Sequence, residues 1–580
     1  MLRPVVGATA LLVLGAAAAT SATLRQAPSR PAPGAAAASA GLGAPAPGEG
    51  GGRVGATGGA ARAAAGRPTL LVFVTIDQMR ADYFARFGPQ LTGGLRRLYD
   101  EGAYFSNAHQ DHAITETAPG HASAMSGRFP ASTGILRNAA GVQDPQAPLV
   151  GAAGPAASPF RFRGTVLFDW LRLADPRARA LSVSAKDRGA ILPLGRAKQS
   201  VFWWSQADGR FTTSTYYADT LPDWVKQLNA RDFPRRYAGR SWEPLLPPAQ
   251  YPEPDTVAAE NGGRRAVFPY RLPEEPRDAA RAIYGTPWMD EVTAEAALAG
   301  LEALQLGRGP QTDVLAVSFS ATDAVGHAFG MDSRELHDQV LRLDRTLGAF
   351  LDSLYRVRDP ATVIVALTGD HGMAPYPELH FAADPKRGRA DVWPVLDAHR
   401  RRLAARGVDT SRAFELESGA LLVDEEAFRQ GGVKLDSAMR AMVADLRRVP
   451  GVHSVLLRGD LAEAARRGDK YAGRWQRMLP ADLPVAAVIT LQPYVYYAGV
   501  SYATHGSPHD YDSNVPVLFH GAPFRPGRHD EYARVVDMAP TLAAVLGVRP
   551  TEPLDGRVLV RALRTPETAA AAGAPLPIRK

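Results

Sequence analysis

Cysteine is absent from all 580 residues of the chain. This absence excludes disulfide bonds, thiolate metal ligands, a cysteine nucleophile and a lipid anchor on cysteine. Any metal site must therefore be built from imidazole nitrogen and from carboxylate or hydroxyl oxygen.

Long apolar runs are scarce as well. One apolar stretch, residues 5–19, follows Arg3 and precedes small residues around 19–22, which is the layout of a secretory signal peptide. A membrane anchor is the alternative, but the stretch is shorter than the roughly 17–25 residues that cross a bilayer. We expect a signal peptide over 1–22, export to the periplasm or the medium, and no stable membrane anchor.

Dense runs of one charge are missing too, although the net charge is +7. The arginines responsible are spread along the chain, so we expect no nucleic-acid binding and only weak attraction for anionic substrates. Large apolar side chains are scarce in 23–67 and 566–580, which are rich in Ala and Pro. Such segments bury too little surface to offset their ordering entropy, which predicts a disordered leader and a disordered tail.

From residue 68 onward, apolar strands alternate with helical stretches. This pattern predicts an α/β fold with a doubly wound, mostly parallel sheet flanked by helices. We expect the catalytic core in three parts, 68–205, 291–385 and 501–565. A Trp-, Tyr- and Pro-rich cap insertion would occupy 206–290, and a small α+β insertion would occupy 386–500. Inserted caps favour an enzyme whose site lies between core and cap.

Carboxylates follow three of the apolar runs. Residues 70–76 end in Asp77, residues 362–369 end in Asp370, and residues 314–320 come shortly before Asp323. An open α/β sheet binds its ligands outside the carboxyl ends of its strands, so these side chains are candidates for one site. Each Asp alone is also a good helix cap. His327, four residues after Asp323, and His371, next to Asp370, favour a metal site over three separate caps.

A hydroxyl and two cations complete the candidate site. Thr117 precedes Ala-Pro-Gly-His121, where a helix is expected to open. Local sequence alone favours a structural role for Thr117, but a threonine beside a metal can be activated as a nucleophile. Lys186 and Arg188 follow the strand-like residues 181–185, and we expect them on one side of an extended segment, facing one anion.

Together these motifs resemble the alkaline phosphatase superfamily, in the order and spacing of the PafA-type alkaline phosphatases. The resemblance covers about 70–565 and is carried by the following segments: Thr75-Ile-Asp77-Gln-Met-Arg80, Thr117-Ala-Pro-Gly-His121, Asn138, Lys186-Asp-Arg188-Gly-Ala190, Asp323-x-x-x-His327-x-x-Gly330, Thr368-Gly-Asp370-His371-Gly372, Thr504-His505-Gly-Ser-Pro508 and Asp537-Met-Ala-Pro-Thr-Leu-Ala543.

The resemblance implies an alkaline phosphatase-like fold and two zinc ions per chain. One ion would be held by Asp77, Thr117, Asp370 and His371, and the other by Asp323, His327 and His505. Thr117 would be the nucleophile, and Asn138, Lys186 and Arg188 would bind the phosphoryl oxygens. His509 lies close to His505 in the sequence and competes with it as a ligand; the Thr-His-Gly context favours His505. His109, His112 and His121 match no ligand of the family. We expect His121 to order the turn at Thr117, and His109 and His112 to be exposed or to support ligands.

The expected function is therefore an exported two-zinc alkaline phosphatase that hydrolyses small phosphate monoesters through a phospho-threonine. The alternative is a phosphodiesterase or nucleotide pyrophosphatase with the same metals. Lys186 and Arg188 favour the first, because they suit a dianionic phosphoryl group. A sulfatase is disfavoured by the missing cysteine motif. A non-catalytic metal- or phosphate-binding protein is disfavoured because every chemical position is filled. The sequence makes no prediction of oligomeric state.

Overall fold

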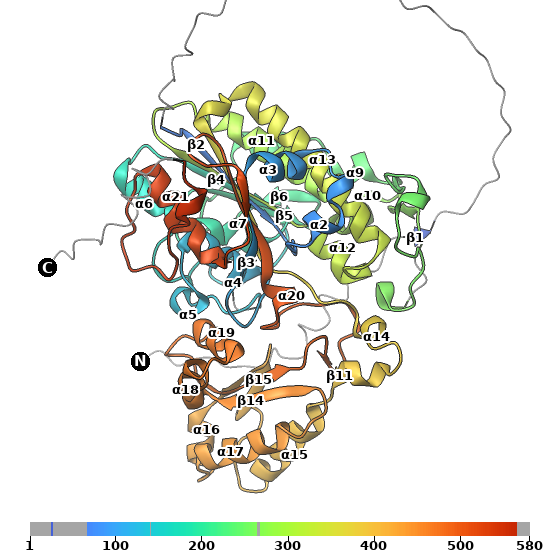
Figure 1. Ribbon diagram of the computed structural model, residues 1–580, viewed down its shortest axis with the longest axis vertical. Helices are drawn as coiled ribbons and strands as arrows, with labels where there is room; N and C mark the ends of the chain where they lie inside the picture. Colours follow the sequence, from blue (N-terminus) through green and yellow to red (C-terminus); the bar gives the residue numbers. More distant parts are fainter. Residues whose placement is uncertain (1–24, 27–66, 140, 264–266, 565–580) are drawn as a thin grey trace, which may run out of the picture.

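A computed structural model describes residues 25–26, 67–139, 141–263 and 267–564 (Figure 1). The predicted signal peptide (1–22) and tail (566–580) lie outside the described residues, as does nearly all of the predicted leader (23–67).

A ten-stranded sheet forms the centre of the larger lobe, in the order β18-β3-β17-β10-β2-β9-β4-β5-β6, with β19 beside β3. Its middle strand β2 (Leu70–Ile76) lies between β9 (Asp313–Phe319) and β10 (Val363–Gly369), and the three run parallel. Strands β4 (Ala180–Ser184) and β5 (Ser200–Ser205) continue in the same direction, whereas β17 (Asn514–His520) runs antiparallel between β10 and β3 (Ala103–His109). The predicted α/β class and mostly parallel sheet are confirmed.

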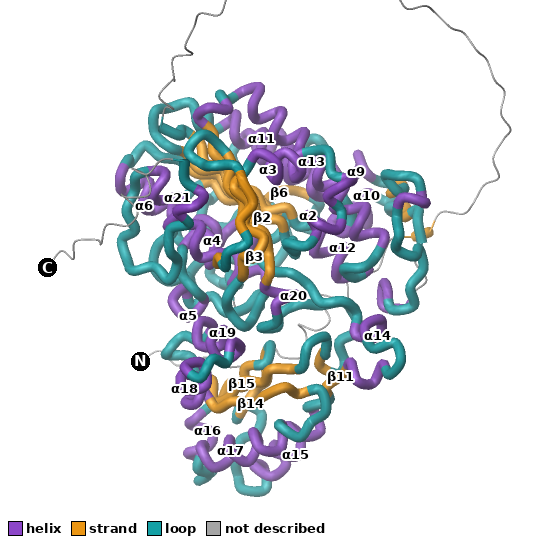
Figure 2. The backbone as a smooth tube through the Cα atoms, in the orientation of Figure 1, coloured by secondary structure: helices purple, strands orange, loops and turns teal. Residues whose placement is uncertain are grey.

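Both faces of this sheet are covered by helices (Figure 2). Side chains alternate along a strand, so Leu70 and Val72 of β2 enter one apolar core while Leu71 and Phe73 enter the other. The first core includes residues of α3 (Gly94–Glu101), α11 (Trp288–Ala303) and α13 (Arg334–Val357). The second includes residues of α4 (Thr117–Ser126), α6 (Leu167–Ala174) and α21 (Met538–Leu546). Burial on both sides explains why the central strands are uninterrupted apolar runs.

One local prediction is wrong. Lys186 and Arg188 do not share an extended segment, because β4 ends at Ser184 and Lys186 is the N-cap of α7 (Asp187–Ile191). Asp187 occupies the first turn, where a carboxylate interacts favourably with the helix dipole. The Ser184 hydroxyl accepts a hydrogen bond from the Lys186 amide at 3.0 Å, which turns the chain into the helix.

A second lobe lies beneath the main sheet in Figure 1. It holds a four-stranded antiparallel sheet of β12 (Phe414–Glu417), β13 (Ala420–Val423), β15 (Val485–Leu491) and β14 (Val452–Leu457). Helices α15 (Trp393–Ala404) and α17 (Leu435–Leu446) share its separate apolar core. Trp475 and Met478 of α19 (Lys470–Met478) pack with Ala113 and Ile114 of the larger lobe, so the two lobes are joined by apolar contact.

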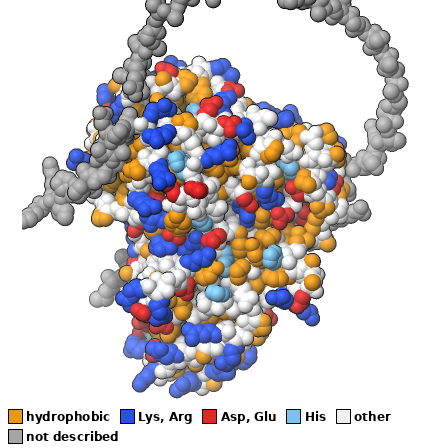
Figure 3. Space-filling view, viewed as in Figure 1, with side chains coloured by type: hydrophobic (Ala, Val, Ile, Leu, Met, Phe, Trp, Pro, Cys, Tyr) orange, Lys and Arg blue, Asp and Glu red, His pale blue; other side chains and the backbone are white. Residues whose placement is uncertain are grey.

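The segment 206–290 contains short elements only. It begins with β6 (Arg210–Thr212), which pairs with β5, and continues through α8 (Asp223–Asn229), α9 (Phe233–Tyr237) and α10 (Pro276–Ala282). One of its strands, β8 (Tyr270–Arg271), pairs with both β7 (Ser241–Trp242) and β1 (Arg25–Gln26) in a small sheet. On the face drawn in Figure 3, Lys and Arg side chains are interspersed with acidic and apolar ones. None of the helices in the described ranges combines the length and apolar character needed to cross a bilayer.

Candidate active site

Three buried carboxylates meet at one edge of the main sheet. Asp77 follows β2 and Asp370 follows β10, while Asp323 lies in the first turn of α12 (Ala321–Phe329), directly after β9. Because the three strands are parallel neighbours, their carboxyl ends point to the same edge. All three side chains are withdrawn from solvent, so their mutual repulsion is screened very little.

Three imidazoles face these carboxylates. In His371, His505 and His327 the Nδ1 atom lies 2.9, 2.8 and 2.6 Å from the carbonyl oxygens of Gly372, Thr115 and Ala503. A carbonyl oxygen only accepts, so each Nδ1 carries the hydrogen and a neutral ring presents its Nε2 lone pair.

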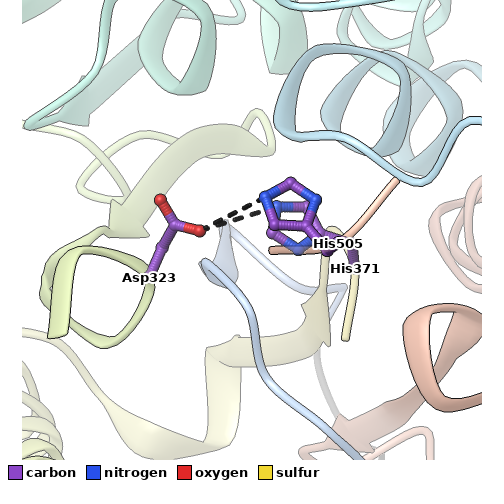
Figure 4. Close-up of side chains that lie close together, drawn as sticks. All are labelled: Asp323, His371 and His505. Carbon is purple, nitrogen blue, oxygen red and sulfur yellow. Dashed lines mark ion pairs between the residues drawn. The ribbon is translucent and has the colours of Figure 1, made fainter. Parts of the chain in front are cut away.

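These Nε2 atoms point at carboxylate oxygens. The distances are 3.2 Å from His327 and 3.6 Å from His505 to Asp323 Oδ1, and 3.4 Å from His371 to Asp77 Oδ1. Figure 4 shows the stacked rings of His371 and His505, 3.5 Å apart, turned toward Asp323. Burial, with the neighbouring imidazoles, holds the pKa of His505 well below its usual value, which keeps that ring neutral.

The donor set fits a divalent metal. A neutral imidazole lone pair facing a carboxylate oxygen sets one acceptor against another, an arrangement that a cation between them stabilises. At His371, although burial opposes it, Asp370 and Asp77 raise the pKa to about 9, so these groups favour a positive charge between them. Oδ1 of Asp77 and Nε2 of His371 are buried without a hydrogen-bond partner among the described residues, and they face each other at 3.4 Å. Burial, reinforced by Asp323 and Asp370, raises the pKa of Asp77, so an isolated charge there is costly. Carboxylate and imidazole are ligands of zinc.

Two overlapping groups of ligand atoms lie within 4.8 Å of one another, Asp77 with Asp370 and His371, and Asp323 with His371 and His505. The first group contains three of the four residues predicted for one ion. The second contains two of the three predicted for the other, and His327 lies beside it. His509 is elsewhere: its ring nitrogens lie 3.1 Å from the Tyr471 hydroxyl and 2.9 Å from the Leu491 carbonyl.

Thr117 and Lys186 lie beside the candidate metal ligands. Thr117 begins α4 and is 1% exposed, with its Oγ1 3.4 Å from Lys186 Nζ. The same Nζ lies 2.5 Å from Oδ2 of both Asp77 and Asp323. Although burial opposes it, these two carboxylates raise the pKa of Lys186, which keeps the ammonium charged. A hydroxyl, a cation and the metal ligands thus converge on one point.

Arg188 and Asn138 flank this point. Arg188 Nη1 lies 3.4 Å from Asp187, and its Nε has no hydrogen-bond partner among the described residues. Asn138 Oδ1 accepts a hydrogen bond from the Ala118 amide at 2.9 Å. The carboxamide is therefore oriented with its Nδ2 donors turned away from the helix start.

Sequence reasoning missed Gln78, which ties two of the carboxylates together. Its amide donates to Asp370 Oδ1 at 3.0 Å, and its Nε2 donates to Asp323 Oδ1 at 2.8 Å. To do both it adopts a φ of 64°, in the left-handed region that non-glycine residues seldom occupy. A Cβ at Gly326 would collide with Gln78 Oε1, so the glycine makes room for this side chain. The only local signal was a polar residue directly after Asp77.

Three further histidines lie near the site. His121 Nδ1 is 2.9 Å from the Thr117 carbonyl and 3.2 Å from Asp370 Oδ2, so His121 contacts the Thr117 turn as predicted. His109 and His112 are buried rather than exposed, 7% and 0% accessible. His109 is the last residue of β3, and its Nδ1 lies 3.3 Å from the Arg474 guanidinium of the second lobe.

Tyr284, in the predicted cap insertion 206–290, is affected by the charges of both cations, Lys186 and Arg188. Burial raises the pKa of its hydroxyl to about 12. The expected cap therefore contributes a polar group beside the proposed phosphoryl-binding cations.

Comparison with known proteins identifies the family of the chain. The profile of the type I phosphodiesterase / nucleotide pyrophosphatase family matches residues 71–387, more than half of the sequence. The chain belongs to this family. Among the relatives of this chain, "Alkaline phosphatase PhoV" of Synechococcus elongatus is 30% identical over 521 residues, 86% of this chain and 93% of PhoV. "Alkaline phosphatase PhoK" of Sphingomonas sp is 31% identical over 537 residues, 86% and 91% of the two chains.

The crystal structure of alkaline phosphatase PafA, a protein known from Elizabethkingia meningoseptica, superimposes with a TM-score of 0.79 at 28% identity. The match covers 86% of this chain and 99% of PafA. The resemblance to PafA-type enzymes read from the motifs is thereby confirmed for the fold as a whole.

Proposed function

We propose that the protein is an alkaline phosphatase that hydrolyses phosphate monoesters at two zinc ions through a phospho-threonine, after export from the cytoplasm. The observation that carries this proposal is the convergence of Thr117 Oγ1 and the buried Lys186 ammonium on the carboxylates of Asp77 and Asp323. The similarity to proteins named alkaline phosphatases over most of the chain supports it. The signal-like segment 1–22 supports export.

We assign the ligands to two ions as the motifs suggest. Asp77, Thr117, Asp370 and His371 would hold one ion, and a second set, Asp323, His327 and His505, would hold the other. Two divalent ions in such a site stabilise the charge on the attacking and leaving oxygens of an in-line displacement. The carbonyl partners of the three imidazoles fix which ring nitrogen faces the site.

The chain's own groups carry out the remaining steps. Thr117 Oγ1, presented at the start of α4, attacks phosphorus and displaces the alcohol. Lys186, Arg188 and the Asn138 amide donate to the phosphoryl oxygens, whose charge the surrounding low-dielectric site makes costly without them. His121 holds the Thr117 carbonyl and keeps the nucleophile in line. Water then hydrolyses the phospho-threonine, and phosphate leaves.

The alternative is phosphodiesterase or nucleotide pyrophosphatase activity, which the name of the matching family favours. The two cations Lys186 and Arg188 suit a phosphoryl group with two full charges, whereas a diester has one charge less. We therefore place monoesters first and diesters second as substrates.

The nucleophile is tested with Thr117→Ala and Thr117→Ser. The Ala variant should lose several orders of magnitude in kcat for an aryl phosphate monoester while keeping its fold, and the Ser variant should retain measurable activity because the hydroxyl remains. Rates on the monoester and on its methyl diester, with metal analysis of the same sample, separate the two activities. Near-normal turnover by the Ala variant would assign the attack to water or to another residue.

A further inference from the structure

The loop that carries Asn138 is connected to Ser418 of the second lobe through the side chain of Glu116. Glu116, directly before Thr117, accepts a hydrogen bond from the Asn138 amide on Oε2 at 2.7 Å. Its other oxygen, Oε1, accepts from the Ser418 hydroxyl at 2.9 Å. Ser418 lies in the turn between β12 and β13, so one carboxylate joins the phosphoryl-binding loop to the hairpin of the insertion 386–500.

A second contact runs alongside the first. Arg137, next to Asn138, forms an ion pair with Glu417, next to Ser418. Two consecutive residues of the loop are thus connected to two consecutive residues of the hairpin. Arg137 contacts Glu417 directly, and Asn138 is linked to Ser418 through Glu116. Charged and neutral hydrogen bonds of this kind, partly withdrawn from water, fix a loop in register more strongly than either would alone.

The turn itself is rigid. Ser418 and Gly419 both have left-handed backbones, with φ of 46° and 86°. The Gly419 carbonyl accepts from the Ile489 amide of β15 at 2.7 Å, and a Cβ at Gly419 would come within 2.8 Å of the Ile489 carbonyl oxygen. The hairpin is therefore seated on the sheet of the second lobe, and it presents the Ser418 hydroxyl at a defined position.

Glu116 lies where a carboxylate without hydrogen-bond partners would weaken phosphate binding. It is the neighbour of the proposed nucleophile, and a free negative charge there would repel a phosphate dianion. Both of its oxygens are instead engaged by a backbone amide and a hydroxyl. Its contacts are those of an acceptor that orders the loop.

Asn138 is thereby fixed at three atoms. Its amide is held by Glu116, its Oδ1 by the Ala118 amide at 2.9 Å, and its carbonyl by the Gly141 amide at 3.1 Å. Within the described residues no acceptor engages Nδ2, which is the donor left for a phosphoryl oxygen. The direction of that donor depends on the backbone of the loop, and the loop depends on Glu116.

We propose that Glu116 and Ser418 are positioning residues that make the second lobe part of the phosphoryl-binding site, by holding Asn138 in the geometry that donates to the transferred group. The inference rests on the proposed role of Asn138 in phosphoryl transfer. The inference gives the 386–500 insertion a function, because its hairpin turn would determine how strongly the site binds phosphate.

A double-mutant cycle on the full, zinc-loaded chain tests this coupling. Ser418→Ala should lower kcat/KM for an aryl phosphate by on the order of 10-fold and should weaken competitive inhibition by inorganic phosphate, because a misplacement of about 1 Å can cost up to about 100-fold. In an Asn138→Ala background the same change should have less than about a twofold effect, since the group it positions is gone. Glu116→Gln, which keeps one acceptor oxygen, should lie between Glu116→Ala and the unaltered protein.

Ser411→Ala is the matched control. The Ser411 hydroxyl also donates to a carboxylate of the same insertion, Asp409, at 2.6 Å, but it is exposed and its partner is two residues away, not in the loop that carries Asn138. It should leave kcat/KM unchanged. Zinc content and thermal unfolding of all variants identify any loss caused by misfolding.

The outcomes separate the two levels of the argument. Equal losses from Ser418→Ala with and without Asn138 would overturn the positioning role, as would unchanged kinetics in Ser418→Ala. If the unaltered protein hydrolyses only the methyl diester, the proposed monoesterase function fails, and the same cycle measured on the diester decides the inference. If it hydrolyses neither ester, calorimetric titration with inorganic phosphate provides the cycle, and additive losses of affinity overturn the inference.

Discussion

Gly120 is the position where a single methyl group should separate the proposed nucleophile, Thr117, from the proposed metal ligand Asp370. It lies in the first turns of α4, three residues after Thr117, and packs directly on the backbone of Asp370. A Cβ built at Gly120 would lie 2.8 Å from the Asp370 Cα and carbonyl carbon, and closer still to the carbonyl oxygen. Since ordinary carbon–carbon contacts are about 3.5–4.0 Å, Gly120→Ala requires α4 and the end of β10 to separate by about 1 Å.

That displacement defines the expected loss. Thr117 moves with α4, and Asp370 remains with the strand, so the distance between the nucleophile and its metal ligand changes. A shift of this size is expected to lower kcat/KM for an aryl phosphate monoester by about 100-fold. Backbone atoms cannot rotate out of the way, so repacking of side chains does not relieve the contact.

The assay compares kcat/KM, zinc content and thermal unfolding of Gly120→Ala with those of Gly473→Ala. Gly473 is also a glycine inside a helix, α19, but the nearest atom to its added Cβ is the flexible Arg477 guanidinium at 3.4 Å. The control should be active and unaltered in zinc content. Normal kcat/KM and zinc content in a folded Gly120→Ala protein would refute the argument that close packing of α4 on Asp370 fixes the reacting geometry.

Three other predictions address the metals, the cations and a buried acid. Removal of metal by a chelator should abolish activity and added zinc should restore it; full activity at less than about one metal per chain would contradict the two-metal site. Lys186→Ala combined with Arg188→Ala should reduce kcat/KM far more for a phosphate monoester than for its methyl diester, because each cation contributes roughly 2–4 kcal/mol to binding a doubly charged group; equal losses on both esters would favour the phosphodiesterase assignment. Asp290 is fully buried against the start of α12, and burial raises its pKa from 3.8 to about 7. Its neutral form is therefore favoured in the folded protein, and the stability present below about pH 4 is lost as the pH rises through about 7. Asp290→Asn should therefore gain in stability relative to the unaltered protein between pH 4 and pH 8, by up to about 4 kcal/mol in urea unfolding, and a difference independent of pH would contradict the assigned pKa.

The strand-end carboxylates were predictable because two regular patterns coincide there. A strand buried on both faces is an uninterrupted apolar run, so its end is visible in the sequence, and parallel neighbours bring such ends to one edge. The predicted run 70–76 is β2 itself, the run 314–320 is β9 shifted by one residue, and the run 362–369 begins one residue before β10. The family motifs added Thr117 and His505, whose neighbours alone were uninformative.

Other features depend on contacts that no local pattern records. Glu116 and Ser418 are 302 residues apart, and neither lies in a segment with a distinctive periodicity. The left-handed backbone of Gln78 is required by its two carboxylate partners, which come from two other strand ends. The helix at Lys186 was mistaken for an extended segment because a five-residue helix is too short to show a period.

The position of β2 in the middle of the main sheet determines the order in which the chain can fold. Its two partners, β9 and β10, begin 243 and 293 positions later in the chain, so the sheet cannot acquire its centre while only the N-terminal half has emerged. Pairings of such long range close slowly and leave apolar strands unpaired in the meantime. The strand pairs of the smaller lobe all lie within residues 414–491, so this lobe can fold without waiting for the main sheet. We therefore expect the nascent chain to depend on factors that shield its first strands until the third aspartate-bearing segment arrives.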